Sequence, residues 1–177
     1  MTGPIVELKI IDPRLLEWGI PSYQSDMAAA IDLYACLDAP LELRPGSAPV
    51  LVPAGFAMHM ADASMAAMIL PRSGLGHRKG LVLGNLVGLI DADYTGPIMV
   101  SAWHRGASGS DPIVLAPGER FAQMVFVPVL RPAFKIVESF SVGSARGAGG
   151  FGSTGVHALP TQAVIHENAT PFRHDTL

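Results

Sequence analysis

A single cysteine, Cys36, stands in a sequence of 177 residues. One cysteine excludes an internal disulfide and a cluster of thiolate metal ligands. The first ten residues also lack the apolar core of a signal peptide, since Glu7 and Lys9 interrupt it. We therefore expect a cytoplasmic protein.

Charged side chains are scarce as well: they make up 15% of the residues and leave a formal net charge of −3. Such a chain has no broad basic surface for duplex nucleic acid, and we expect no nucleic-acid partner. No stretch approaches the roughly 18 apolar residues of a membrane helix, so we expect no membrane partner either. Because 49% of the residues are apolar, the low charge indicates surface that is buried between subunits.

Helical periodicity is nearly absent. Short apolar or alternating runs recur about every ten residues between Gly, Pro, Asp and Ser, which is typical of an all-β sandwich or barrel. A helix from Asp62 to Met68 would run straight into Pro71, whereas a short helix is expected from Ser73 to Arg78. The expected strands are Val6–Ile10, Ile31–Ala35, Leu41–Leu43, Val50–Val52, Phe56–Met60, Ala67–Leu70, Leu81–Leu83, Val87–Ile90, Pro97–Trp103, Ile113–Leu115, Phe121–Val127 and Ala133–Glu138.

The composition changes near residue 141. Residues 141–155 are rich in Gly and Ser, and residues 156–177 are polar without clear periodicity. We predict one β domain over residues 1–140, a Gly-rich C-terminal arm over 141–155 and a flexible polar tail over 156–177.

The arm carries a candidate phosphate site from Arg146 to Gly155. Its glycines let backbone amides approach an anion, and Arg146, Ser153 and Thr154 add donors. The segment also matches G-x-G-x-x-G, but no expected strand precedes it and no helix follows, so a dinucleotide fold is not supported. Phe151 has no core to join and is expected to close over a flat ligand such as a base. A flexible tail without a ligand is the alternative.

A turn after an expected strand places Arg72 and Ser73 together. Pro71 ends the strand, and Ser73 is expected to cap a short helix whose first amides attract anions. An ordinary cap beside a solvated Arg72 is the alternative.

Asp91 follows an apolar dipeptide in a segment, residues 84–100, that we interpret as a β-hairpin. At a strand end in partly apolar surroundings, a carboxylate can act as a general base. A turn-forming role for Asp91 and Asp93 is the alternative, and a metal clamp by the two is only weakly indicated.

Two polar residues interrupt apolar strands. Gln123 must find a hydrogen-bond partner if it is buried, either within the protein or on a ligand. Asp32 is either a residue that faces water or a partner for an arginine or a hydrated cation.

The order and spacing of five segments together resemble the motifs of homotrimeric dUTPases of the bacterial type. The resemblance implies a distorted β jelly roll and a homotrimer with a shared apolar axis. It also implies hydrolysis of dUTP to dUMP and diphosphate at subunit interfaces, where the arm of one chain covers a site built by the others. The five segments are Ala29–Leu33, Pro71–Gly76, Gly88–Gly96, Gly118–Gln123 and Arg146–Gly155.

The same resemblance implies how the nucleoside is bound. Asn85 and the backbone near Leu89, Ile90 and Met99 would contact uracil, in a pocket too tight for the 5-methyl group of thymine. Tyr94 would pack under the sugar and exclude a ribose 2′-hydroxyl.

For the reaction, the resemblance implies that Asp91 activates the water that attacks the α-phosphorus. Arg72, Ser73 and Gly74 would bind the phosphate chain, with Ser73 near the α–β bridging oxygen. Gln123 would help to place the phosphates or the water. Further contacts to the γ-phosphate and to uracil would come from Arg146, Phe151, Gly152, Ser153 and Thr154.

Mg²⁺ is the implied cofactor, held chiefly by the triphosphate and by water. Asp32 would act on the metal only indirectly or would serve as an arginine partner. One departure from the family pattern is Ala30, which stands where a glycine is usual. An alanine at positive φ would be strained.

Two rival functions are considered. A dCTP deaminase is similar in fold but needs a glutamate where this chain has Ser101. A non-catalytic nucleotide-binding trimer would not require the intact set of Asp91, Ser73 and Arg146.

Overall fold

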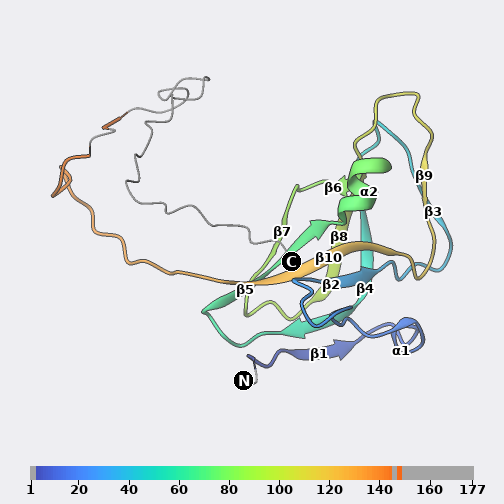
Figure 1. The fold of residues 1–177 in the computed structure, drawn as a ribbon, viewed down its shortest axis with the longest axis horizontal. Helices are drawn as coiled ribbons and strands as arrows, with labels where there is room; N and C mark the ends of the chain where they lie inside the picture. The colour runs from blue at the N-terminus through green and yellow to red at the C-terminus, as the bar shows by residue number, and fades with distance from the viewer. Residues whose placement is uncertain (1–2, 145–146, 149–177) are drawn as a thin grey trace, which may run out of the picture. The chain divides into compact units, whose positions relative to one another are not determined.

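The computed structural model describes residues 3–144 and 147–148, and the chain divides into two compact units, Met1–Ala133 and Phe134–Leu177. The helices and strands found in the described residues all lie in the first unit (Figure 1). None of these helices is long and apolar enough to cross a membrane. The elements are β1 (Glu7–Ile10), α1 (Leu15–Trp18), β2 (Ile31–Tyr34), β3 (Leu41–Leu43), β4 (Val50–His59), β5 (Met65–Pro71), α2 (Ser73–Arg78), β6 (Leu81–Leu83), β7 (Gly88–Ile90), β8 (Pro97–His104), β9 (Ile113–Leu115) and β10 (Arg120–Pro128).

Two four-stranded antiparallel sheets build the first unit. Their strand orders are β1-β4-β8-β6 and β2-β10-β5-β7, and a smaller sheet pairs β3 with β9. One hydrophobic cluster draws on both large sheets, with Val52 and Ile98 from the first and Leu33, Ile69 and Met124 from the second. Since side chains alternate along a strand, one face of each sheet supplies this shared core. The all-β prediction is therefore confirmed.

β4 runs without interruption where the sequence predicted two strands, Val50–Val52 and Phe56–Met60. The intervening residues stay in the strand, although its register with β8 shifts between Pro53 and Ala57. A bulge of this kind lets a strand bend and continue. Gly55 has a φ of +80° there. Proline and glycine are typical turn residues, so Pro53 and Gly55 suggested a turn between two separate strands.

β5 and α2 decide between the two short helices considered from the sequence. Met65–Pro71 is a strand, so a helix from Asp62 to Met68 is excluded, whereas the helix Ser73–Arg78 is confirmed. β5 lies between β10 and β7 and hydrogen-bonds to both. These ladders outweigh the weak helix preference of its residues. The sequence did not reveal α1, because a single turn is too short to show periodicity.

The strand expected at Ala133–Glu138 is absent. In the second unit the side chains of Phe134 and Ile136 are 94% and 99% exposed. An alternating apolar run becomes a strand only where another strand supplies hydrogen-bond partners. No described residue pairs with this segment, so the prediction was wrong for the isolated chain.

Ala30 is not strained. Among the described residues other than glycine, positive φ occurs at Ala61 and Leu86. The first motif therefore accepts an alanine without the backbone cost that the family pattern suggested.

Gly55 is a position where the fold has no room for a side chain. A Cβ there would lie 2.3 Å from Sγ of Cys36, at a φ of +80°, whereas Gly46 has a φ of +79° and nothing within 4 Å. We expect Gly55→Ala to lower the free energy of unfolding by about 2–4 kcal/mol. Gly46→Ala introduces the same backbone strain without a clash, so it should lower the free energy of unfolding by only about 1 kcal/mol. Urea unfolding measures both, and equal losses would contradict the contact with Cys36.

Burial raises the pKa of Cys36 to about 11, and the nearby carboxylate of Asp12 adds to the shift. The thiolate is the reactive form, so the native thiol should resist iodoacetamide at about pH 8. Unfolding in urea should expose it to rapid alkylation, which mass spectrometry detects as one added group. Rapid alkylation of the native protein would show that the thiol is accessible or ionised.

Candidate active site

The end of β5 carries three of the residues expected to bind phosphate. Pro71 ends the strand, and Arg72 is the N-cap of α2, with φ −76° and ψ 131°. Ser73 is therefore the first helical residue and not the cap that the sequence predicted. Its side chain is exposed, and Gly74 follows it in the first turn. Arg72, Ser73 and Gly74 thus share one turn at the end of β5.

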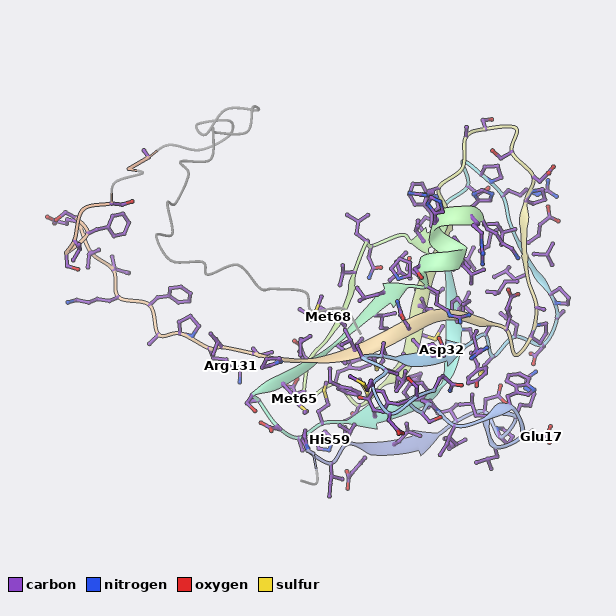
Figure 2. The ribbon with its side chains drawn as sticks, viewed as in Figure 1. Glu17, Asp32, His59, Met65, Met68 and Arg131 are labelled. Carbon is purple, nitrogen blue, oxygen red and sulfur yellow. The ribbon has the colours of Figure 1, made fainter. Side chains whose placement is uncertain are left out.

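Asp32 on β2 holds Arg72 by an ion pair. Nε of Arg72 lies 3.0 Å from Oδ1 of Asp32, and Nη1 of Arg120 lies 3.1 Å from Oδ2. The Asp32 side chain is only 13% exposed, and Figure 2 shows it on β2 beside β10. Of the roles considered for Asp32, the structure supports the arginine partner and excludes a residue that simply faces water.

Arg120 was not singled out from the sequence. It lies in the segment Gly118–Gln123, and the motif itself was the one signal that could have drawn attention to it. An arginine beside a turn usually points into solvent, and no local pattern names a partner 88 residues away along the chain. Its partner follows from the sheet order, which places β2 next to β10.

Gln123 on β10 is half-buried and hydrogen-bonded within the chain. Its Nε2 donates to the carbonyl oxygen of Pro71 at 2.9 Å. This bond ties β10 to the residue before Arg72 and satisfies the structural role that the sequence allowed. A contact between Gln123 and a ligand stays a prediction.

Residues 84–100 do not form the hairpin that the sequence predicted. β7 pairs with β5, whereas β8 pairs with β4 and β6, so the two strands belong to different sheets. Alternating apolar residues indicate a strand but do not identify the strand with which it pairs. The segment therefore crosses from one sheet to the other.

Asp91 directly follows β7, at the strand end that the sequence predicted. Its side chain is exposed in the isolated chain, so the partly apolar surroundings expected for it are not found. Asp91 lines a pocket of about 490 Å³ that also includes Asp93, Asp62 and Arg131. His59 and Met65, labelled with Arg131 in Figure 2, line this pocket as well.

Tyr94 is held in place by the turn after Asp91. Its backbone N–H donates to the carbonyl oxygen of Asp91 at 3.1 Å, and its Oη donates to that of Pro97 at 3.0 Å. A Cβ on Gly96 would lie 2.5 Å from the Tyr94 Oη. Glycine at position 96 thus leaves space for the ring of Tyr94, a residue that is 43% exposed.

The residues expected to contact uracil lie around β7 and β8. Asn85 is exposed in the turn after β6, Leu89 and Met99 are 63% and 38% exposed, and Ile90 packs partly against the core. The backbone N–H of Gly84 donates to the carbonyl oxygen of Ser101 on β8 at 2.8 Å. The turn with Asn85 therefore leaves the sheet beside the strand that carries Met99.

The two groups of expected site residues lie at opposite ends of β5. Asp91 comes level with the start of β5, because the preceding Ile90 pairs with Ala67, and Ser73 follows its last residue. Some six residues of extended strand separate these levels, a distance of about 20 Å. In Figure 2, Met65 marks the start of the strand, and α2 lies beyond its other end. One chain alone does not bring Asp91 to the turn with Ser73.

The expected residues of the arm fall outside the described residues. They are Arg146, Phe151, Gly152, Ser153 and Thr154. The tail over residues 156–177 lies outside as well. The roles of these residues, and the boundaries of the arm and tail, stay predictions.

The described ranges contain no cluster of three His, Cys, Asp or Glu side chains that could hold a metal ion. Asp32 is unsuited to bind a metal directly, because guanidinium groups engage both of its oxygens. Asp91 and Asp93, the exposed carboxylates after β7, suit contact with a hydrated Mg²⁺, which prefers oxygen ligands and keeps several waters.

Comparison with known proteins identifies the family. The family model for dUTPase matches residues 16–155. The deoxyuridine 5′-triphosphate nucleotidohydrolases of Janthinobacterium sp. (strain Marseille) and Burkholderia multivorans are 56% and 57% identical over 152 residues. These alignments cover 86% of this chain and 98% and 99% of the two relatives. The chain therefore belongs to the dUTPase family.

Solved structures agree on the fold. The dUTPase of Staphylococcus bacteriophage 80alpha with dUpNHpp has a TM-score of 0.74 at 22% identity, covering 87% of this chain and 100% of that chain. A mutant dUTPase from phage phi11 of S. aureus, whose structure reveals the coordination of a structural Mg(II) ion, has a TM-score of 0.68 at 19% identity. That alignment covers 78% of this chain and 99% of the phage phi11 chain. The expected dUTPase-like β fold is confirmed.

Proposed function

We propose that this chain hydrolyses dUTP to dUMP and diphosphate in the cytoplasm, by attack of water on the α-phosphorus. Relatives that are 54–57% identical and named for this reaction support the substrate. The structural observation that carries the proposal is the turn after β5, where Asp32 fixes Arg72 beside the exposed Ser73. The reaction would supply dUMP for thymidylate synthesis and keep uracil out of DNA.

Asp91 is the proposed general base. Its exposed carboxylate at the end of β7 can orient a water molecule and accept its proton during an in-line attack. Displacement at phosphorus needs little more than this base, positioned donors and a metal ion.

The turn after β5 is the proposed site for the phosphate chain. Arg72 and Gly74 bind phosphate oxygens, and the Ser73 hydroxyl stabilises the charge that develops on the leaving oxygen. Gln123 helps to place the phosphates through the bond that ties it to Pro71. The arm is proposed to complete the site with Arg146, Phe151, Gly152, Ser153 and Thr154.

The region around β7 and β8 is proposed to select the nucleoside. Asn85, Met99 and the backbone near Leu89 and Ile90 contact uracil, and Tyr94 packs under the deoxyribose. Tyr94 suits this role because its hydroxyl donates to the carbonyl oxygen of Pro97 and the residue remains 43% exposed.

Mg²⁺ is the proposed cofactor, carried mainly by the triphosphate. When bound, it neutralises phosphate charge and so assists the departure of diphosphate. Asp32 acts on the phosphate chain through Arg72 and not as a direct ligand of the metal, since both of its oxygens are engaged.

We propose a homotrimer whose active sites lie between chains. The attacking water and the leaving oxygen flank one phosphorus, so Asp91 and Ser73 cannot act together across about 20 Å of strand. A site that takes Asp91 from one chain and Ser73 from another brings both residues to the same phosphorus. Exposed apolar side chains offer surface for such an assembly: Leu130, Phe134, Ile136, Phe140 and Val142.

A nucleotide panel assayed for diphosphate, with and without Mg²⁺, tests the proposed function. We expect fast hydrolysis of dUTP and little hydrolysis of dTTP, dCTP or UTP. Ammonia released from dCTP would indicate a deaminase instead. Equal consumption of dTTP would contradict the proposed uracil pocket.

The Asp91→Asn variant tests the base. It should bind the analogue dUpNHpp as the unmodified chain does, in calorimetry, but lose about 10²–10⁴-fold in turnover of dUTP. Asp38→Asn is a matched control, because that carboxylate is fully exposed and lies outside the proposed site. Undiminished turnover in Asp91→Asn would remove Asp91 from its role.

Mixing two inactive variants tests the site between chains. Chains with Asp91→Asn and chains with Ser73→Ala, unfolded together and refolded as mixed assemblies, should regain activity. With equal amounts and random assembly, about one quarter of the sites would combine an intact Asp91 with an intact Ser73 from another chain. Separately refolded variants are the control. No recovery in the mixture would place both residues in one chain's site.

A further inference from the structure

Arg120, at the start of β10, has no role in the proposed chemistry, yet it adjoins the phosphate-binding turn. Its Nη1 lies 3.1 Å from Oδ2 of Asp32, while Nε of Arg72 lies 3.0 Å from Oδ1. Arg72 also donates from Nη1 to the backbone carbonyl oxygen of Arg120 at 2.8 Å. The two arginines are therefore linked twice, through a shared carboxylate and through the main chain.

A break in the register of β10 brings Arg120 to this place. β10 pairs Gln123 with Asp32, but Arg120 and not Phe121 pairs with Tyr34. Because side chains alternate along a strand, an unbroken ladder would put Phe121 on the face of Asp32 and Arg120 on the other. Phe121 is therefore an extra residue in β10. Its side chain packs into the core, where Phe121 is 2% exposed, and the side chain of Arg120 lies on the same face as Asp32.

This network holds the Arg72 guanidinium at two of its three nitrogens. A guanidinium has five N–H donors, and here Nε and Nη1 face Asp32 and the main chain of Arg120. Nη2 forms no hydrogen bond with any residue in ranges 3–144 and 147–148. The side chain is 32% exposed. Arg72 therefore presents its remaining donors in the planar arrangement that suits phosphate oxygens.

Arg120 also sets the net charge beside the turn. Arg72 and Asp32 alone would form a neutral pair, whereas the second arginine leaves one net positive charge on the three groups. The Asp32 side chain is 13% exposed, whereas the side chains of Arg72 and Arg120 are 32% and 43% exposed, so the positive groups of the network face partly into solvent. Positive charge thus remains available for a polyanion.

We propose that Arg120 is a positioning residue for dUTP hydrolysis. It binds Asp32, so that Arg72 keeps both the orientation and the charge needed to hold the phosphate chain. Arg120 does not have to touch the substrate for this. The inference rests on the proposed function and adds to it the residue that prepares the phosphate-binding turn.

The experiment replaces Arg120 and leaves the backbone carbonyl in place. Arg120→Met should lower kcat/KM for dUTP about 10- to 100-fold, because small misplacements of a phosphate-binding group are costly in rate. Its affinity for dUpNHpp should fall, while its affinity for deoxyuridine, which has no phosphate, should not change. Arg120→Lys should recover most of the activity, since its ammonium group can still pair with Asp32.

Arg44→Met is the matched control. Arg44 also pairs with a carboxylate, Glu42 at 2.7 Å, but its side chain is 69% exposed and lies outside the proposed site. Arg44→Met should therefore leave kcat/KM for dUTP unchanged. Thermal unfolding of each variant separates lost positioning from lost folding, and Arg120→Gln replaces Arg120→Met if the latter does not fold.

A double variant shows whether Arg120 acts through Asp32. Arg120→Met combined with Asp32→Asn should lose no more activity than the more impaired single variant, because both remove the same link. Additive losses, unchanged kcat/KM in Arg120→Met, or an equal loss of deoxyuridine affinity would each overturn the inference. A wild-type chain that releases no diphosphate from dUTP would overturn the proposed function, and this inference with it.

Discussion

The length of β5 is the constraint on which the site depends. β5 is hydrogen-bonded to β10 on one side and to β7 on the other, and some six residues of strand separate the turn with Ser73 from the level of Asp91. A shorter strand would lose pairs of the ladder with β10, which extends from Met65 to Pro71. If both residues act on one phosphorus, as proposed, a second chain has to supply one of them. Low charge and exposed apolar side chains are properties that suit such an assembly.

Electrostatics at the phosphate-binding turn depend on strand order rather than on sequence neighbours. Asp32 and Arg120 are 88 residues apart along the chain, and Arg72 lies 48 residues before Arg120. The order β2-β10-β5 makes all three adjacent. One carboxylate between two guanidinium groups orients Arg72 and leaves a net positive charge, which a single ion pair would not do.

Most strands could be predicted because alternation and turn residues are local signals. The wrong strand predictions concern segments whose structure depends on which strand they pair with. Residues 53–55 look like a turn but remain in β4, and residues 84–100 look like a hairpin but join two sheets. Residues 133–138 alternate as a strand does, yet they have no partner strand among the described residues. Propensity shows that a segment can be extended, whereas only the assembled sheets show with what it pairs.

The sequence by itself determined the all-β class, the family and the identity of the candidate residues, because motif order and residue type are properties of the linear chain. Only the tertiary structure decided that Ser73 lies inside α2 rather than capping it, that Arg120 shares Asp32 with Arg72, and that Asp91 lies at the far end of β5. The last two are relations between segments far apart along the chain. They arise from strand register and sheet order, which long-range hydrogen bonds and a shared core establish together.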